Sequence, residues 1–305
     1  PSSLKGEKIE GLKSFVIKRF FRLYPLFWAS IPFGLFSMWY IWFKPVSFAM
    51  VLANITMVPS FFGQEMIIGL YWTLAVEVIF YIICAIFFFL SILRSEKYLS
   101  ITLVLLIICS FTFFNFDNIG HFKSTDFIYF SRDTSYTLTY IGFMFLGALL
   151  RRWVSPDGLG FTGKTAVIIF VSVWLWQSVS SWIDFKYNGQ PFEYLKNTLR
   201  YNIAMAIYFL FTILIKINLS FMAWLGRISY SLYLLHPVVM YSLLWLTRYD
   251  AFHGWHISIY MALATLFTII LSSASYRYIE SPFINAGDKL SKKITYPKEV
   301  ISRNS

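Results

Sequence analysis

Glu77 is the residue of this chain whose type and position most directly suggest chemistry. It stands roughly ten residues into the apolar run 67–93, which is about 15 Å at the rise of a helix and so deep within any bilayer that the run crosses. A carboxyl group at that depth costs several kcal/mol unless it faces a protein cavity that supplies a partner. Glu77 therefore marks a candidate site, where a carboxylate can order a base or a hydroxyl substrate.

His236 is a second candidate for the same site. It lies about eight residues into the apolar run 228–246, or roughly 12 Å, so it can share a depth with Glu77. A carboxylate beside an imidazole fixes its tautomer and raises its basicity, which is what activation of a hydroxyl group requires. On depth alone, a structural hydrogen bond between helices is the better explanation of a single histidine in such a run.

Two arginines near the start of the chain have the spacing that binds an anion. Arg19 and Arg22 are three residues apart, so in a helix they share a face and can hold one phosphate together. The basic segment 1–22 that contains them has the pattern of a helix at the membrane interface. Basic residues also flank most cytoplasmic helix ends, so an electrostatic anchor is an equal alternative.

The elements that carry these residues are apolar segments of membrane-spanning length. Hydrophobic residues make up 58% of the chain and charged residues only 13%, which excludes an ordinary soluble domain of 305 residues. Long uninterrupted apolar runs also exclude the alternating pattern of a transmembrane β-barrel. We expect an all-α, polytopic bundle of about eight spans, formed by the runs 24–43, 67–93, 98–116, 135–150, 165–183, 198–215, 228–246 and 255–276.

The distribution of charge predicts the orientation and the partners of this bundle. With a cytoplasmic N-terminus, most of the 26 Lys and Arg residues fall on the cytoplasmic side, as the positive-inside rule requires. Both termini are then cytoplasmic, and the net charge of +11 indicates contact with membrane lipids. Nucleic acid is not expected as a partner, because the basic residues are spread over separate short loops. The sequence leaves the oligomeric state open.

Cysteine and histidine placement gives no sign of a metal site. Cys84 and Cys109 both fall inside apolar runs, where a free cysteine behaves as a small hydrophobic residue. His253 and His256 are three residues apart in a short loop, and only Asp250 stands near them as a further ligand. We therefore predict neither a disulfide framework nor a bound metal.

Four segments resemble, in the same order, the motifs of the acyltransferase-3 family of membrane acyltransferases. Residues 19–25 resemble its Arg-x-x-Arg-hydrophobic-x-Pro signature, and residues 72–81 are similar to Trp-Ser-Leu-x-x-Glu-x-x-Phe-Tyr. Residues 226–236 resemble Gly-x-x-Ser-Tyr-x-x-Tyr-x-x-His, and residues 280–283 resemble the closing Glu-x-Pro-Phe. Each string is weak by itself, but four in order make the resemblance specific, from about residue 13 to residue 283.

The resemblance implies an O-acyltransferase of the bacterial cytoplasmic (inner) membrane. Cytoplasmic acyl-CoA, most simply acetyl-CoA, would be the co-substrate, with no bound cofactor. The acceptor would be a hydroxyl of a cell-surface glycan or of its lipid-linked precursor. The implied catalytic residues are Glu77 and His236, and the donor would be bound by Arg19 and Arg22.

Three further motif residues have an acceptor-binding or a structural role in this interpretation. They are Trp72, Tyr230 and Glu280. Trp72 also suits the aromatic belt at the membrane interface, and Glu280 could form a local pair with Arg277 one turn before it. Pro282 is expected to end the last apolar helix.

The chain departs from the family pattern at its start. Members commonly have ten spans, the first with an Arg and then a His regarded as catalytic, followed by a Ser-Gly-Phe element, and neither is found here. We therefore expect an N-terminally incomplete membrane domain, 1–283, followed by a polar cytoplasmic tail, 284–305. A secondary transporter and a catalytically inactive scaffold remain alternatives. Broken helices in two corresponding halves would favour the transporter, and a genuine start codon just before residue 1 would favour the scaffold.

Overall fold

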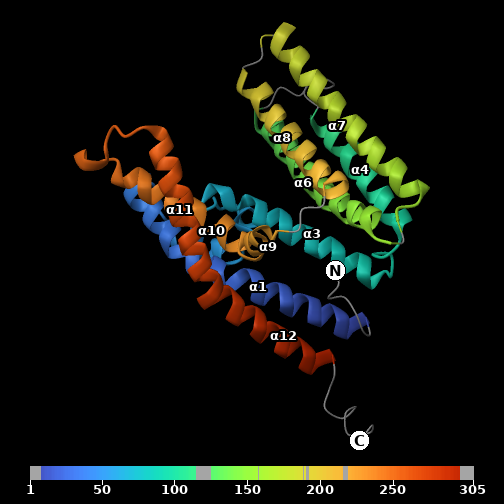
Figure 1. The fold of residues 1–305 in the computed structure, drawn as a ribbon, viewed down its shortest axis with the longest axis horizontal. Coiled ribbons are helices and arrows are strands. Elements are labelled where there is room, and N and C mark those ends of the chain that lie inside the picture. The colour runs from blue at the N-terminus through green and yellow to red at the C-terminus, as the bar shows by residue number, and fades with distance from the viewer. Residues whose placement is uncertain are drawn as a thin grey trace, which may run out of the picture. The chain divides into compact units, whose positions relative to one another are not determined.

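The structure is a computed structural model that describes residues 8–114, 125–156, 158–187, 189, 192–215 and 219–295 (Figure 1). Every regular element in these ranges is a helix, which confirms the all-α prediction for this part of the chain. The chain divides into two compact units, which are described separately. Unit 1 combines Pro1–Phe89 with Leu219–Ser305, and unit 2 is Leu90–Asn218. All the residues that the sequence singles out for chemistry belong to unit 1.

Unit 1 consists of long helices joined by short helical turns. Its α-helices are α1 (Lys8–Phe36), α2 (Phe48–Ile55), α3 (Trp72–Phe89), α9 (Ser220–Arg227), α10 (Ser229–Leu246), α11 (Ile257–Ser275) and α12 (Ser281–Thr295). The π-turns η1 (Ser37–Ile41) and η6 (Tyr276–Glu280) extend α1 and connect α11 to α12, and the 3-10 turns are η2 (Pro59–Phe62), η3 (Gly69–Tyr71) and η5 (Asp250–Phe252).

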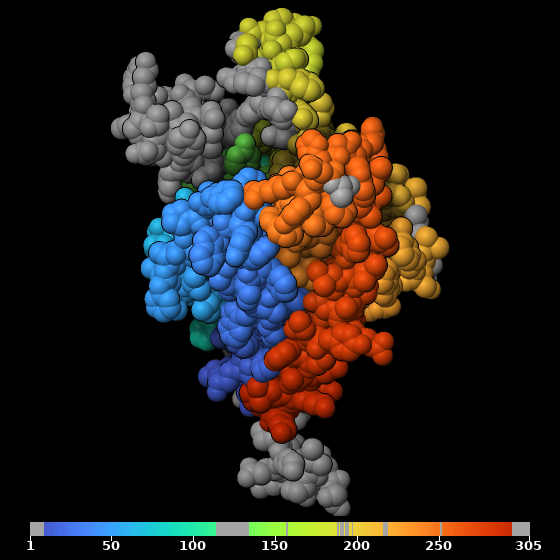
Figure 2. All heavy atoms as spheres, turned by 90° about the vertical axis from the view of Figure 1, so that its left-hand side faces the viewer, coloured from blue at the N-terminus to red at the C-terminus, as the bar shows by residue number. Residues whose placement is uncertain are grey.

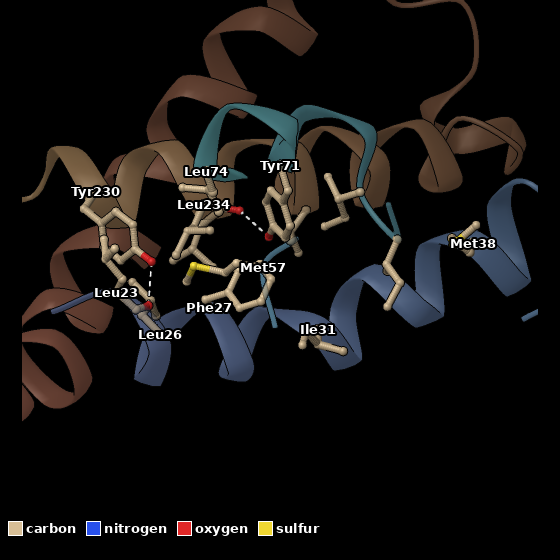
Figure 3. Packing of buried hydrophobic residues seen from close by; sticks show 14 of the residues in the cluster. Leu23, Leu26, Phe27, Ile31, Met38, Met57, Tyr71, Leu74, Tyr230 and Leu234 are labelled. Atoms are coloured by element: carbon tan, nitrogen blue, oxygen red, sulfur yellow. Dashed lines mark hydrogen bonds between the residues drawn. The ribbon is translucent and has the colours of Figure 1, made fainter. Parts of the chain in front are cut away.

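The core of unit 1 lies where α1, α3 and α10 meet (Figure 3). Apolar side chains of α1, such as Phe27, pack there against Leu74 of α3 and Leu234 of α10. The hydroxyl of the buried Tyr71 lies 2.9 Å from Ser30 Oγ and 3.0 Å from the Leu234 carbonyl oxygen. Because a buried hydroxyl without a partner is costly, these contacts fix how α1, α10 and the start of α3 are aligned along their axes.

Helices α1 and α12 pack side by side, as the blue and red segments of Figure 2 show. Ser14 Oγ lies 2.5 Å from Ser291 Oγ, and Lys18 Nζ lies 3.2 Å from Asp288 Oδ1. The expectation that Pro282 ends the preceding helix is wrong, because the helical path continues through η6 into α12. The polar tail expected from residue 284 is therefore helical as far as residue 295, and residues 296–305 lie outside the described part.

Gly287 allows this close approach, and its replacement is expected to separate the two helices. A Cβ atom at Gly287 would stand 2.7 Å from the Cβ of Phe21, which no real contact tolerates. We expect Gly287→Ala to lower the free energy of unfolding by about 1–3 kcal/mol, the usual cost of overpacking. Thermal unfolding in detergent measures the loss. Gly226→Ala is the matched control, because nothing lies within 4 Å of a Cβ there; equal stability of the two variants would contradict the prediction.

Unit 2 contains α4 (Glu96–Phe114), α6 (Thr125–Val154), α7 (Phe161–Tyr187), α8 (Phe192–Phe209) and the π-turn η4 (Leu210–Leu214). Buried hydroxyls join α4 to α6, where Ser110 Oγ donates to the carbonyl of Ser135 at 2.9 Å. Glu96, at the start of α4, accepts hydrogen bonds from the backbone N–H groups of Gly160 (3.0 Å) and Gly163 (2.9 Å) at the start of α7. The two helix starts are therefore neighbours, and the carboxylate caps α7.

Four described helical segments are long and apolar enough to cross a membrane. They are Gly69–Phe89, Glu96–Phe113, Phe161–Tyr187 and Ile257–Ile294, and the pair α9 and α10, bent by 67°, would be a fifth. These segments confirm a helical membrane protein. The expected eight spans and cytoplasmic termini stay predictions.

Ser155, just after α6, and Tyr187, at the end of α7, provide a test of that topology. Cysteines are introduced at the exposed Tyr187 or at Ser155 in a variant in which Cys84 and Cys109 are alanine. We expect an impermeant maleimide added to intact cells to label position 187 and not position 155, because the charge asymmetry places the second inside. Labelling of position 155 alone would invert the orientation.

Candidate active site

Arg19, Tyr81 and Glu77 form a continuous polar chain between α1 and α3. The guanidinium carbon of Arg19 lies 4.7 Å from the centre of the Tyr81 ring, and its Nη1 donates to the Tyr81 hydroxyl at 3.4 Å. The Tyr81 hydroxyl donates in turn to Glu77 Oε1, one helical turn earlier on α3. Through Tyr81 the charges of Arg19 and Glu77 compensate each other, which lowers the cost of holding either one away from water.

One donor of Arg19 is unsatisfied. Its Nε atom is buried and has no hydrogen-bond partner in the described part of the chain. The ring of Phe15, 5.5 Å from the guanidinium carbon, covers another side of the group. A buried donor without a partner costs about 1–3 kcal/mol, and more when it is charged. Such a donor needs an explanation, because nearly all buried polar groups are paired.

Glu280 occupies a second buried position, beside the first turn of α10. Its side chain is only 1% exposed, and its Oε2 accepts a hydrogen bond from Ser231 Oγ at 2.6 Å. The backbone N–H of Ser231 also donates to this carboxylate. Because the first N–H groups of a helix lack partners within it, Glu280 caps α10 from another helix.

The expected local pair between Glu280 and Arg277 is not formed. Arg277 is exposed, and its guanidinium carbon lies 5.9 Å from the centre of the Tyr278 ring. Both residues belong to the π-turn η6. A π-turn holds more residues per turn than an α-helix, so two residues three apart do not face each other there. The turn directs Glu280 to α10 instead.

Arg22 and Tyr230 lie within electrostatic reach of the carboxylates of this site. Arg22 is exposed and lies within electrostatic reach of Glu280. Tyr230 is buried, donates its hydroxyl to the Leu23 carbonyl at 2.5 Å, and lies within electrostatic reach of both Glu77 and Glu280 (Figure 3). The arginine pair on α1 therefore stands near one carboxylate from α3 and one from η6.

Ser231→Ala is expected to destabilise unit 1 more than an ordinary serine substitution does. The change removes the hydroxyl that donates to the buried Glu280 and leaves that carboxylate with fewer donors. Loss of a hydrogen bond to a charged group costs about 1.5–3 kcal/mol, so the melting temperature should fall. Ser242→Ala, which removes only a bond to a carbonyl of its own helix, is the control. Equal melting temperatures would show that Ser231 does not hold Glu280.

His236 lies near the middle of α10, and Trp72 lies at the start of α3. Trp72 is the half-buried first residue of α3. His236 is also half-buried, and its Nδ1 lies 3.2 Å from the Leu232 carbonyl oxygen. A carbonyl oxygen only accepts, so a hydrogen bond at this contact requires the proton on Nδ1.

The expected pairing of Glu77 with His236 is wrong in this structure. In the described part of the chain, no hydrogen bond or ion pair joins them. The Thr73 and Tyr233 hydroxyls are hydrogen-bonded to each other across α3 and α10, which run antiparallel. Glu77 lies one turn beyond Thr73 along α3, and His236 one turn beyond Tyr233 along α10. Because the helices are antiparallel, Glu77 and His236 lie on opposite sides of the contact between Thr73 and Tyr233.

Sequence reasoning missed the residues that connect the site. Tyr81 lies four residues after Glu77, a spacing that places two side chains on the same face of a helix, so this partner was open to prediction. Ser231 and the pair of Thr73 and Tyr233 depend on contacts between helices far apart in the sequence. Among the described residues, no three His, Cys, Asp or Glu side chains gather as a metal site requires.

Comparison with known proteins identifies the family. A family model described as an acyltransferase domain, that of acyltransferase-3, matches residues 3–277, which is most of the chain. No curated protein and no solved structure matches the chain. The matched range includes three complete motifs, in residues 19–25, 72–81 and 226–236. The resemblance is thus confirmed over most of its length, and the chain belongs to the acyltransferase-3 family.

Proposed function

We propose that this acyltransferase transfers an acyl group, most simply acetyl, from cytoplasmic acyl-CoA to a hydroxyl of a cell-surface glycan or its lipid-linked precursor. The bacterial cytoplasmic membrane is the proposed location. The observation that carries the proposal is the polar chain of Arg19, Tyr81 and Glu77, with its unsatisfied Arg19 Nε–H. The charged Arg19 Nε–H group, which has no acceptor in the described part of the chain and lies inside an acyltransferase domain, suits a substrate with an anionic or carbonyl oxygen.

The arginine pair has two different roles in this proposal. Arg22 is exposed, so it can meet the phosphates of the donor at the surface of the protein. Arg19 is half-buried and held by Tyr81, so its free N–H can meet an oxygen that enters further. Two guanidinium groups one turn apart then hold one donor molecule at two depths.

The proposed base is His236. Its Nδ1 contact with Leu232 leaves the Nε2 lone pair for the proton of the acceptor hydroxyl. Glu77, through Tyr81, holds the Arg19 guanidinium group, which faces the acyl-CoA donor in this proposal. In the balanced reaction, the acceptor oxygen forms an ester bond with the acyl carbon, the bond between that carbon and the CoA sulfur breaks, and the proton leaves on His236 for the thiolate.

Labelled donor tests this proposal directly. Membrane vesicles from cells that express the chain, from cells that lack it, and from cells with Glu77→Gln receive acetyl-CoA labelled in the acetyl group. Label and a mass increase of one acetyl group per modified sugar should appear in the glycan fraction of the first sample only. Ester label equal in all three samples would refute acyl transfer by this chain. Equal ester label in all three samples is the result expected if the chain is a transporter or an inactive scaffold.

A further inference from the structure

Unit 2 contains a groove that the proposed reaction does not use. It lies between the first halves of α4 and α7 and has a volume of about 320 Å³. Its walls are almost wholly apolar, with Ile101 and Leu105 on α4 and Ala166 and Ile169 on α7. The starts of the two helices are neighbours through Glu96, so the groove begins at this end of unit 2.

One polar atom in this apolar wall has no partner. Ser100 is 2% exposed, it lines the groove, and its Oγ has no hydrogen-bond partner in the described part of the chain. On the same helix, the equally buried Ser110 donates to the carbonyl of Ser135. Because buried hydroxyls are nearly always satisfied, the Ser100 hydroxyl indicates a ligand atom that accepts a hydrogen bond.

A cation stands on the same helical face, one turn before this hydroxyl. Lys97 is exposed and precedes Ser100 by three residues and Ile101 by four, the spacings that place side chains on one face. On α7, Lys164 is exposed and within electrostatic reach of Glu96. Glu96 has Arg152 and Lys164 within electrostatic reach, so cations other than Lys97 balance its charge.

We propose that this groove binds one anionic phospholipid. Along α4 the exposed Lys97 stands one turn before the groove, and the wall itself then has Ser100 followed by apolar side chains to Leu105. A phospholipid presents a phosphate, an ester carbonyl and an acyl chain in the same order. The phosphate lies at Lys97, the ester carbonyl accepts from Ser100 Oγ, and the chain follows the apolar wall.

The same order of groups argues against other occupants. A peptide segment in this apolar groove would leave backbone N–H and C=O groups unpaired. In acyl-CoA the pantetheine arm separates the phosphates from the acyl group, which does not suit a cation and a hydroxyl only one turn apart. The exposed aromatic ring of Phe161, 86% exposed at the rim, suits the head-group level of a membrane. This site is independent of the proposed acyl transfer.

Head-group selectivity is the first test. The full chain, purified and stripped of lipid, is titrated with dioleoyl phosphatidylglycerol or dioleoyl phosphatidylcholine, and bound lipid is counted by native mass spectrometry. We expect the anionic lipid to bind about tenfold more tightly. Lys97→Gln should remove most of this preference, whereas Lys186→Gln, at the other end of α7, should keep it. Equal binding of the two lipids, or equal effects of the two substitutions, would overturn the proposal.

The ester contact is the second test, and it begins with the unaltered protein. Phosphatidylglycerol with ether-linked chains lacks the carbonyl that Ser100 would meet. It should bind about threefold to tenfold more weakly than the ester form, the range of one neutral hydrogen bond. Ser100→Ala should make the two forms bind alike, with an unchanged circular dichroism spectrum. A wild-type protein that does not distinguish ester from ether lipid would show that the groove holds only unspecific membrane lipid.

Discussion

Glu77→Gln is expected to reduce acyl transfer by roughly a hundredfold or more, while the protein keeps its melting temperature. Glutamine preserves the volume and can still accept a hydrogen bond from Tyr81. It removes the negative charge that balances Arg19 through Tyr81, and so changes the electrostatics of the proposed donor-binding group. Acyl transfer to the glycan fraction and thermal unfolding in detergent, measured on the same preparation, check both parts.

Two further substitutions separate this role from packing. If Glu77 were only a structural tie, glutamine would retain activity and Glu77→Leu would destabilise the bundle, since an interhelical hydrogen bond in a membrane is worth about 0.6–2 kcal/mol. His236→Asn gives an independent result, because it removes the proposed base without reaching the chain of Arg19, Tyr81 and Glu77. Full activity of both Glu77→Gln and His236→Asn would end the proposal that these residues take part in transfer.

Arg22→Ala is expected to weaken binding of acyl-CoA by about tenfold to a hundredfold, with normal expression. Loss of a charged hydrogen bond to phosphate typically costs about 1.5–3 kcal/mol, which corresponds to that range. Arg19→Ala should weaken binding as well, and should also lower the melting temperature, because it removes a side chain that packs against the rings of Phe15 and Tyr81. Equilibrium binding of labelled acetyl-CoA to purified protein measures the first effect.

Arg277→Ala is the matched control for the arginine substitutions. Arg277 is exposed, belongs to the same unit, and contacts the ring of Tyr278. Its loss changes the net charge as much as the loss of Arg22 does, so a general electrostatic effect would weaken binding equally in both variants. Unchanged binding in Arg22→Ala and Arg19→Ala would favour the interpretation of the pair as a membrane anchor.

The sequence predicts the helical class and the family, and it singles out Glu77 as a candidate, because each depends on local pattern. A carboxylate inside a long apolar run is conspicuous without any structure. The partner of that carboxylate, by contrast, depends on how the helices are aligned in space. Depth along a run fixes only one coordinate, so Glu77 and His236 could be assigned similar depths, but the contact of Thr73 with Tyr233 sets the actual alignment of α3 and α10.

The end of the chain shows a second limit of local pattern. Pro282 is a common helix terminator, and the residues after it are polar and lysine-rich, so a stop followed by a tail was the natural prediction. In the structure, Gly287 packs against Phe21 and Ser291 contacts Ser14, and these tertiary contacts hold α12 as a helix. The π-turn η6, in which the Ser281 N–H bonds to the Tyr276 carbonyl, changes the hydrogen-bond pattern directly before Pro282 and so accommodates the missing N–H of the proline.

The π-turn η6 sets the rotational phase between α11 and α12. Such a turn amounts to one residue inserted into an otherwise continuous helix. Deleting one residue from Tyr276–Glu280 would let both helices persist but would turn α12 by about 100° relative to α11. The stripe of Gly287 and Ser291 would then leave α1, and the carboxylate of Glu280 would leave α10, in a single step. This single turn thus couples the packing of the last helix to the cap of α10.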